Sequence, residues 1–160
     1  MVSKKLLPVA LILLCVPSVF SQSEDFWISP GAEFAFYSPN GGAYGGGFAL
    51  GYGSGTSIGL KAVYLMEGEY KIKTLELNIL LRFYFQGRYS YSGPFMQILG
   101  GPVIFARDAG INIPSRYGIF SAGAGFGWRF LFNERWFAEP QLRAGYPYAV
   151  GLGVSGGVRF

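Results

Sequence analysis

The sequence predicts an all-β protein, a closed antiparallel up-and-down barrel of eight strands that crosses a membrane. Hydrophobic residues recur at every second position through most of the chain, which is the period of β-strands. Aromatic residues make up 18% of the sequence, and 25 of its 160 residues are glycine. Beyond the N-terminal segment, hydrophobic residues stand singly between glycines and charged residues, so no apolar run is long enough to form a membrane-spanning helix.

The N-terminal segment has the features of a secretory signal peptide. Lys4 and Lys5 precede an apolar run over residues 6–20, and small residues follow. Val19 and Ser21 suit the positions three and one before a cleavage site. We therefore expect residues 1–21 to be removed and residues 22–160 to form one barrel domain. An alternative cleavage would leave Cys15 as a lipid-modified N-terminus, but the bulky Leu14 before it disfavours this.

The composition of the mature chain excludes several classes of protein. It would contain neither cysteine nor histidine, so a disulfide scaffold is excluded. Once Lys4 and Lys5 are removed, 11 basic residues face 9 acidic ones, and no basic run favours binding of nucleic acid. Its carboxylates lack the dense clusters of calcium-binding loops. We therefore expect no metal and no cofactor.

The first four strands are predicted over residues 27–37, 43–53, 57–66 and 71–85. The motifs SPNGG, GSGT and EGE provide the turns between them. The fourth strand shows the clearest alternation. Its apolar face carries Leu75, Leu77, Ile79, Leu81 and Phe83, and its polar face carries Thr74, Glu76, Asn78 and Arg82.

The last four strands are predicted over residues 93–106, 119–130, 136–146 and 150–160. The fifth is the least clear because both of its faces are apolar, and the run Gly100-Gly101-Pro102 suggests a bulge that shifts its register. The sixth alternates large apolar residues with glycines. The polar segment RDAGINIPSR separates the fifth strand from the sixth and is the longest connection.

Three prolines interrupt the predicted strands, and proline cannot donate a ladder hydrogen bond. We expect Pro30 to precede the first full rung, Pro102 to lie in the bulge of the fifth strand, and Pro140 to mark a second bulge.

The distribution of glycine indicates which face of the barrel points inward. The polar faces of the strands also carry about a dozen glycines, which a solvent-exposed sheet face seldom does. Glycines beside long polar side chains are typical of a narrow interior, where large residues lie opposite small ones. The polar residues predicted to line the lumen are Glu33, Lys61, Glu76, Asn78, Arg82, Arg129, Glu139, Gln141, Arg143 and Arg159.

With the polar face inside, the apolar face points outward and requires lipid around it. Backbone in lipid must be fully hydrogen-bonded, so the sheet must close on itself. Aromatic residues near the strand ends then fit the girdles at the membrane boundaries. These residues are Trp27, Tyr37, Tyr44, Phe83, Phe105, Phe120, Trp128, Phe130, Trp136, Tyr146 and Phe160. The dipeptide Arg-Phe, at positions 82, 129 and 159, would place its arginine inside and its phenylalanine outside.

The mature chain resembles the small eight-stranded outer-membrane barrels of the OmpA, OmpX and OmpW-like families. The tail carries the most specific part of this resemblance, because the chain ends on Phe160 after the alternating residues Val158, Val154 and Leu152. The resemblance implies that the barrel-assembly machinery recognises this tail as an assembly signal. It also implies a lipid bilayer as the main partner and the outer membrane of a diderm bacterium as the location.

Buried charges must be paired, so the charges of the lumen favour a structural membrane protein whose lumen is closed by salt bridges. Glu76 and Arg82 lie on the same predicted strand, too far apart to pair with each other. Residues of other strands, such as Glu139 or Arg143, are their expected partners. A narrow passive channel is the alternative, for small solutes that are either hydrophobic or anionic, since five basic residues would face three acidic ones. A surface adhesin acting through residues 107–116 is a weaker alternative.

We expect no enzymatic activity. The enzymes among outer-membrane barrels rely as families on a catalytic histidine, and this chain contains none. The alternative is catalysis by the carboxylates of Glu76 and Glu139 alone.

Overall fold

The computed structural model of the protein describes residues 26–37, 41–67, 72–85, 92–107 and 115–160. The predicted signal peptide and the centre of the predicted adhesin loop, residues 108–114, lie outside these ranges. The described residues form eight strands. Their bounds are β1 Phe26–Tyr37, β2 Gly41–Tyr52, β3 Thr56–Glu67, β4 Ile72–Tyr84, β5 Gly93–Arg107, β6 Ser115–Phe132, β7 Trp136–Tyr146 and β8 Val150–Arg159.

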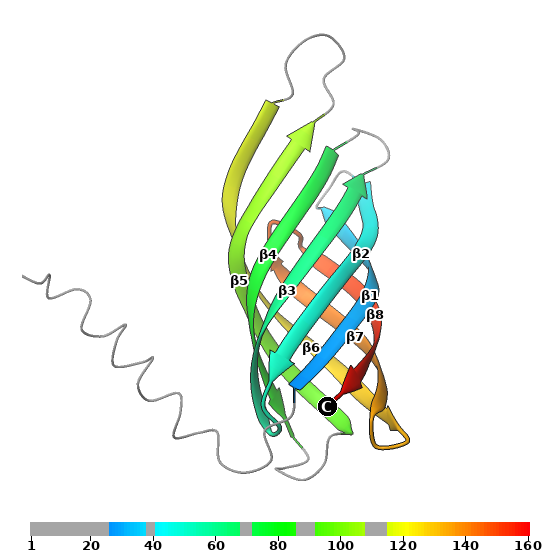
Figure 1. Cartoon of the computed structure of the whole chain (residues 1–160). Coiled ribbons are helices and arrows are strands. Elements are labelled where there is room, and N and C mark those ends of the chain that lie inside the picture. The colour runs from blue at the N-terminus through cyan, green and yellow to red at the C-terminus, as the bar shows by residue number, and fades with distance from the viewer. Residues whose placement is uncertain (1–25, 38–40, 68–71, 86–91, 108–114) are drawn as a thin grey trace, which may run out of the picture.

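The strands form one closed barrel in which each strand pairs antiparallel with its sequence neighbours, and β1 pairs with β8. The predicted fold class and number of strands are therefore confirmed. β1 begins and β8 ends at the same end of the barrel, the lower end in Figure 1. In the described part of the chain, no helix is long and apolar enough to cross a membrane.

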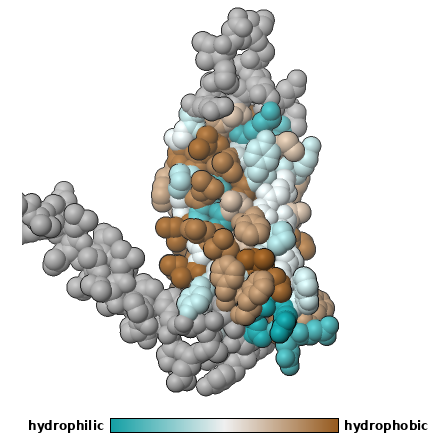
Figure 2. Space-filling view, in the orientation of Figure 1, coloured by the Kyte–Doolittle hydropathy of each residue, from teal (hydrophilic) through white to brown (hydrophobic). Residues whose placement is uncertain are grey.

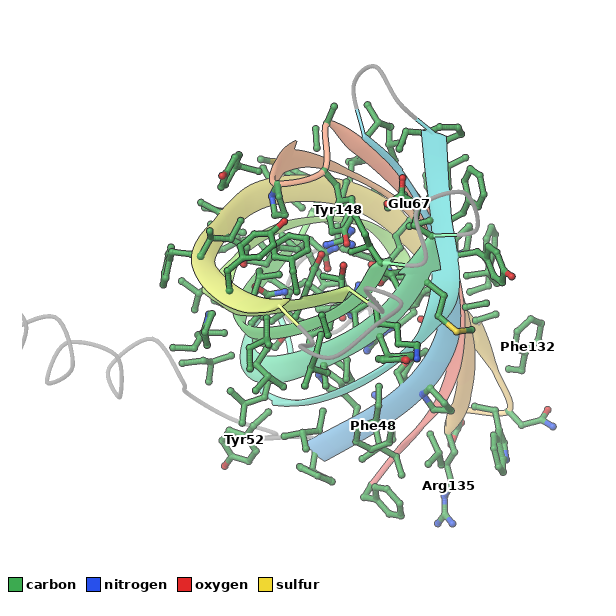
Figure 3. The ribbon with its side chains drawn as sticks, turned by 90° about the horizontal axis from the view of Figure 1, so that it is seen from above. Phe48, Tyr52, Glu67, Phe132, Arg135 and Tyr148 are labelled. Atoms are coloured by element: carbon green, nitrogen blue, oxygen red, sulfur yellow. The ribbon has the colours of Figure 1, made fainter. Side chains whose placement is uncertain are left out.

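Side chains alternate between the outer wall and the interior along each strand. On β4, Leu77 and Ile79 are exposed outside, whereas Glu76 and Asn78 are buried inside. Apolar residues cover much of the visible wall, and hydrophilic residues gather at its lower end (Figure 2). Seen from above, Phe48, Tyr52 and Phe132 lie outside the ring of strands (Figure 3). The apolar outer face is the one that the distribution of glycine predicts.

The wall of the barrel differs in height around its circumference. β5 has 15 residues and β6 has 18, whereas β7 has 11 and β8 has 10. In Figure 1 the wall from β3 to β6 accordingly rises above the turn that joins β7 to β8.

The expectations for the three prolines are wrong, because none of them lies in a bulge or outside the ladder. Pro30, Pro102 and Pro140 each pair in register with one neighbouring strand, opposite Phe48, Phe120 and Val154 respectively. On the other side of each proline the ladder lacks two pairs and then resumes in the same register. Each proline therefore interrupts one ladder without shifting the strand, and β5 keeps a single register throughout.

Two residues predicted to belong to the aromatic girdles point into the barrel instead. Trp27 is 1% exposed and Phe105 is 4% exposed. Both residues are in phase with the inward side chains of their strands, Trp27 with Ser29 on β1 and Phe105 with Val103 on β5. Strand phase, rather than proximity to a strand end, determines the side on which these rings lie.

The assignment of the two faces can be tested with Leu77→Arg. Leu77 is 45% exposed on the outer wall, near the middle of β4. An arginine at the midplane of the lipid-facing wall is expected to lower the free energy of unfolding by about 2–4 kcal/mol. Met66→Arg, near the loop end of β3, is expected to cost roughly 0–1 kcal/mol. Urea unfolding of the protein folded into lipid vesicles measures both values, and equal losses would contradict the assignment.

Candidate functional site

The interior of the barrel contains two groups of ion pairs, and Glu139 is the centre of the lower one. Arg82 Nη1 donates to both carboxylate oxygens of Glu139, at 2.9 and 3.0 Å. Arg129 Nε donates to Glu139 Oε1. All three side chains are at most 2% exposed. One carboxylate on β7 thus holds two guanidinium groups, from β4 and β6.

Aromatic rings surround these two guanidinium groups. The Arg82 guanidinium carbon lies 4.2 Å from the Phe95 ring centre and 4.8 Å from that of Trp27. The Arg129 guanidinium carbon lies 4.0 Å from the Phe137 ring centre. Cations over ring faces are attracted by the ring quadrupole, and this attraction is strongest where water is excluded. The rings therefore support the cations and also close the lower end of the lumen.

Arg143 is the centre of the upper group. Its Nη1 donates to Glu76 Oε2 at 2.7 Å, and its Nη2 lies 3.1 Å from Glu33 Oε2. Glu33 also forms an ion pair with Lys61. These contacts join β7 to β4 and β1, and β1 to β3. The strands in each pair are not neighbours, so the side chains reach across the lumen.

Neutral side chains complete this arrangement between the charged groups. Gln97 Oε1 accepts a hydrogen bond from Arg82 Nη2 at 3.1 Å, and Gln97 Nε2 donates to Gln141 Oε1 at 2.9 Å. Asn78 Nδ2 donates to Glu76 Oε2 at 3.2 Å, and Ser121 Oγ donates to Asn78 Oδ1 at 2.6 Å. Polar groups from β4, β5, β6 and β7 are thus hydrogen-bonded to one another across the interior.

Glycines make room for the large interior side chains. A Cβ atom added to Gly51 would lie 2.4 Å from the ring of Trp27, its partner on β1. Added to Gly127, it would lie 2.4 Å from the ring of Phe95, its partner on β5. Gly151 has the same relation to Arg143, its partner on β7, at 2.9 Å. Each of these glycines lies directly opposite the side chain that needs its space.

Tyr148, in the turn between β7 and β8, covers the upper end of the lumen. Its side chain is buried, and its ring centre lies 5.5 Å from the Arg143 guanidinium carbon. It packs in a cluster with Ala35, Ala43, Val63 and Leu65. In Figure 3, Tyr148 and Glu67 lie at the opening of the ring of strands.

The buried charges of the lumen are balanced, in contrast to the predicted positive surplus. Glu67, predicted to lie in a turn, is inward on β3 and only 7% exposed. Arg159, predicted to line the lumen, is only half-buried, and its Nη2 donates to the carbonyl oxygen of Glu134 at 2.7 Å. The buried carboxylates of the described residues are Glu33, Glu67, Glu76 and Glu139, and the buried cations are Lys61, Arg82, Arg129 and Arg143.

The structure thus places nine of the ten predicted lumen residues in or beside these two groups and leaves Arg159 at the rim. Sequence reasoning missed Trp27, Glu67, Gln97 and Tyr148. The phase of the strand would have identified Glu67, since it continues the inward series of Lys61, Val63 and Leu65. Gln97 had no such signal, because both faces of β5 are apolar. Among the described residues, no group of three or more histidine, cysteine or acidic side chains is arranged to hold a metal ion.

The predicted assembly tail belongs to β8, the strand that closes the barrel by pairing with β1. Leu152, Val154 and Phe160 are exposed on the outer wall, and Val158 is half-buried. The backbone N–H of Phe160 donates to the carbonyl oxygen of Phe26 at 2.9 Å, and the two rings lie 6.1 Å apart. The last residue of the chain is therefore attached to the first residue of β1.

Comparison with solved structures identifies proteins of the same fold. Neisserial surface protein A matches with a TM-score of 0.66 and 12% identity, over 86% of this chain and 98% of that one. OprG from Pseudomonas aeruginosa matches with a TM-score of 0.62 and 12% identity, over 88% and 98%. The N-terminal β-barrel domain of Pseudomonas aeruginosa OprF matches with a TM-score of 0.59 and 18% identity, over 85% and 97%.

These likenesses define the fold of the chain. The chain has the fold of the small eight-stranded outer-membrane β-barrels, as the resemblance of its sequence predicts. No protein-family model matches the sequence. No curated protein matches it significantly.

Proposed function

We propose that this protein is a structural integral protein of a bacterial outer membrane, with a lumen closed by salt bridges and no enzymatic activity. The observation that carries the proposal is the set of ion pairs across the lumen. Arg82 on β4 is bonded to Glu139 on β7, and Arg143 on β7 is bonded to both Glu76 on β4 and Glu33 on β1. Opening a path for ions would require these buried pairs to separate, which is costly in a site that excludes water.

The space left inside the lumen supports the same proposal. An interior cavity beside Ser29, Lys61, Glu139 and Gln141 has a volume of about 10 Å³. This volume holds roughly one water molecule. With Tyr148 above and the rings of Trp27 and Phe137 below, this cavity is too small for a continuous file of water.

Conductance measurements test the proposal. The mature protein, folded and inserted into a planar lipid bilayer, is expected to show no resolvable current steps, because the ion pairs fill the cross-section of the lumen. Regular steps would instead support the narrow channel. If Arg143→Glu then changed the ion preference of those steps, the path would run through the lumen and the structural proposal would be wrong.

We also propose that the C-terminal tail acts as the signal for the barrel-assembly machinery. Deletion of Phe160 is expected to reduce the level of the protein in the outer membrane several-fold. The expected effect exceeds that of Phe83→Ala or Phe130→Ala, because the backbone N–H of Phe160 joins β8 to Phe26 at the start of β1. Immunoblots of outer-membrane fractions measure the three levels. Equal losses would show that Phe160 is an ordinary aromatic residue at the membrane boundary.

A further inference from the structure

A small cavity lies between the two groups of ion pairs in the lumen. Lys61 and Glu33 of the upper group border it, and so do Arg82 and Glu139 of the lower group. Its volume is about 10 Å³, which is room for roughly one small occupant. The cavity therefore touches both groups. Small residues of β1 and β2 leave this space open, namely Gly31, Gly47 and Ala49.

The side chains of these two groups carry one positive charge in excess. The fourth buried carboxylate, Glu67, balances the lumen as a whole but lies six residues beyond Lys61 on β3. At about 3.3 Å per residue, that is roughly 20 Å along the strand, near the upper opening (Figure 3). The excess charge is thus local, and burying it is costly unless a counter-ion lies beside it. The charged members of the two groups are the cations Lys61, Arg82, Arg129 and Arg143 and the carboxylates Glu33, Glu76 and Glu139.

Hydrogen-bond donors are also in excess around the cavity. Arg82 Nε, Ser29 Oγ and Lys61 Nζ are buried and have no hydrogen-bond partner among the described residues. Arginine and lysine side chains can only donate, and a serine hydroxyl can donate as well as accept. In the described part of the chain, the only acceptor atoms in the same state are the carboxylate oxygens of Glu33, which form ion pairs with Lys61 and Arg143. The cavity therefore lacks an acceptor rather than a donor.

The carboxylates that border the cavity are already neutralised by cations. Both oxygens of Glu139 accept hydrogen bonds from Arg82 Nη1, and one of them also accepts from Arg129 Nε. Glu33 Oε2 lies 3.1 Å from Arg143 Nη2. An anion in the cavity would therefore meet paired carboxylates and unpaired N–H groups rather than bare negative charge.

We propose that this cavity binds one chloride ion, held by the Nε–H of Arg82, the hydroxyl of Ser29 and the ammonium group of Lys61. Hydrogen bonds between a charged donor and an anion are stronger than those between neutral groups. The ion neutralises the excess charge of the two groups and supplies the acceptor that these donors lack. The small volume suits a monatomic anion rather than sulfate or phosphate. The site is additional to the structural role and does not require the lumen to conduct.

A water molecule is the competing occupant, and the charges favour chloride over it. Water can accept hydrogen bonds from Arg82 and Ser29, but it leaves the excess positive charge uncompensated. Water must also donate its own two hydrogens, and the carboxylate oxygens of Glu139 are already bonded to guanidinium groups.

The dependence of stability on chloride tests the proposal. A ligand that binds only the folded state stabilises it increasingly as the ligand concentration exceeds the dissociation constant. The mature protein is folded into lipid vesicles and unfolded with urea, and gluconate replaces chloride so that the ionic strength stays constant. Raising chloride from about 1 mM to about 100 mM is expected to increase the folding equilibrium constant about five-fold or more. An unchanged equilibrium constant would overturn the proposal.

Ser29→Ala and Ser57→Ala form a matched pair of variants. Each removes one buried hydroxyl that has no hydrogen-bond partner among the described residues, but only Ser29 borders the cavity. We expect Ser29→Ala to reduce the chloride effect to less than about two-fold and Ser57→Ala to retain it in full, because only the first removes a hydrogen bond to the anion. The same chloride effect in both variants would show that chloride acts elsewhere, and the proposal would be wrong.

A second pair of variants tests the role of charge. Lys61→Met removes the excess positive charge beside the cavity, whereas Lys73→Met removes an exposed charge from the outer wall. The chloride effect is expected to disappear in the first variant and to remain in the second. Retention of the heat-modifiable band on a gel would show that both variants fold. A chloride effect that survives Lys61→Met would contradict an anion bound for its charge.

Long-wavelength X-ray diffraction distinguishes the two occupants directly, because chloride then scatters anomalously and water does not. In crystals of the mature protein grown with chloride, one anomalous peak is expected inside the barrel, within hydrogen-bonding distance of Arg82 Nε and Ser29 Oγ. Electron density in the cavity without an anomalous signal would identify water and overturn the proposal.

Discussion

Replacement of Glu139 by leucine is expected to lower the free energy of unfolding by about 3–5 kcal/mol. The carboxylate of Glu139 is fully buried and is bonded to both Arg82 and Arg129. Leucine fills a similar volume, so the loss arises mainly from two guanidinium groups that remain buried without their counter-charge. Urea unfolding of the protein folded into lipid vesicles measures this loss.

Two further variants separate this cause from a general effect of the substitution. Glu134→Leu, in the exposed turn between β6 and β7, is expected to change stability by less than about 0.5 kcal/mol. Combining Glu139→Leu with Arg82→Leu and Arg129→Leu is expected to recover much of the loss, because well-packed apolar residues can replace a buried ionic group. A loss below about 1 kcal/mol for Glu139→Leu would show that the ion pairs do not hold the lumen closed.

The substitution Gly45→Ala is expected to cost about 1–3 kcal/mol or more. A Cβ atom at Gly45 would lie 1.9 Å from the carbonyl oxygen of Tyr64 on the neighbouring strand β3. The obstruction is backbone rather than a flexible side chain, so β2 and β3 would have to move apart. The ladder between them would weaken over several residues.

The adjacent residue provides the control for Gly45→Ala. A Cβ atom at Gly46 points outward and would meet nothing closer than Gly31 O at 3.5 Å. Gly46→Ala is therefore expected to be neutral or to stabilise by a few tenths of a kcal/mol, through a less flexible unfolded chain. Equal melting temperatures for the two variants in detergent micelles would contradict the close approach of β2 and β3.

The alternation of residues predicts the barrel and its strand number, and the distribution of glycine adds which face of the strands points inward. The period of two places Leu77 and Glu76 on opposite faces without any knowledge of neighbouring strands. The same rule would have placed Trp27 inside, in phase with Ser29. The prediction failed there because the tendency of aromatic residues to lie in girdles was given more weight than strand phase.

The partners of the charged residues depend on more than alternation. Arg82 meets Glu139 because of the combined stagger of the strands between β4 and β7. That stagger accumulates around the barrel and is set by the pairing of every adjacent pair of strands. Strand spacing pointed to Glu139 and Arg143 as partners, but the division into two groups and the part played by Gln97 depend on three-dimensional geometry.

The interrupted ladders at Pro30 and Pro140 determine which part of the barrel unfolds first. β8 lacks pairs with β1 beside Pro30, and β7 lacks pairs with β6 beside Pro140, whereas β7 and β8 remain continuously paired with each other. The β7–β8 hairpin is thus attached to the rest of the wall by two ladders that are both interrupted at nearly the same level. On heating, this hairpin is the cooperative unit that should detach first, ahead of global unfolding, while the continuous β5–β6 ladder persists to the highest temperature.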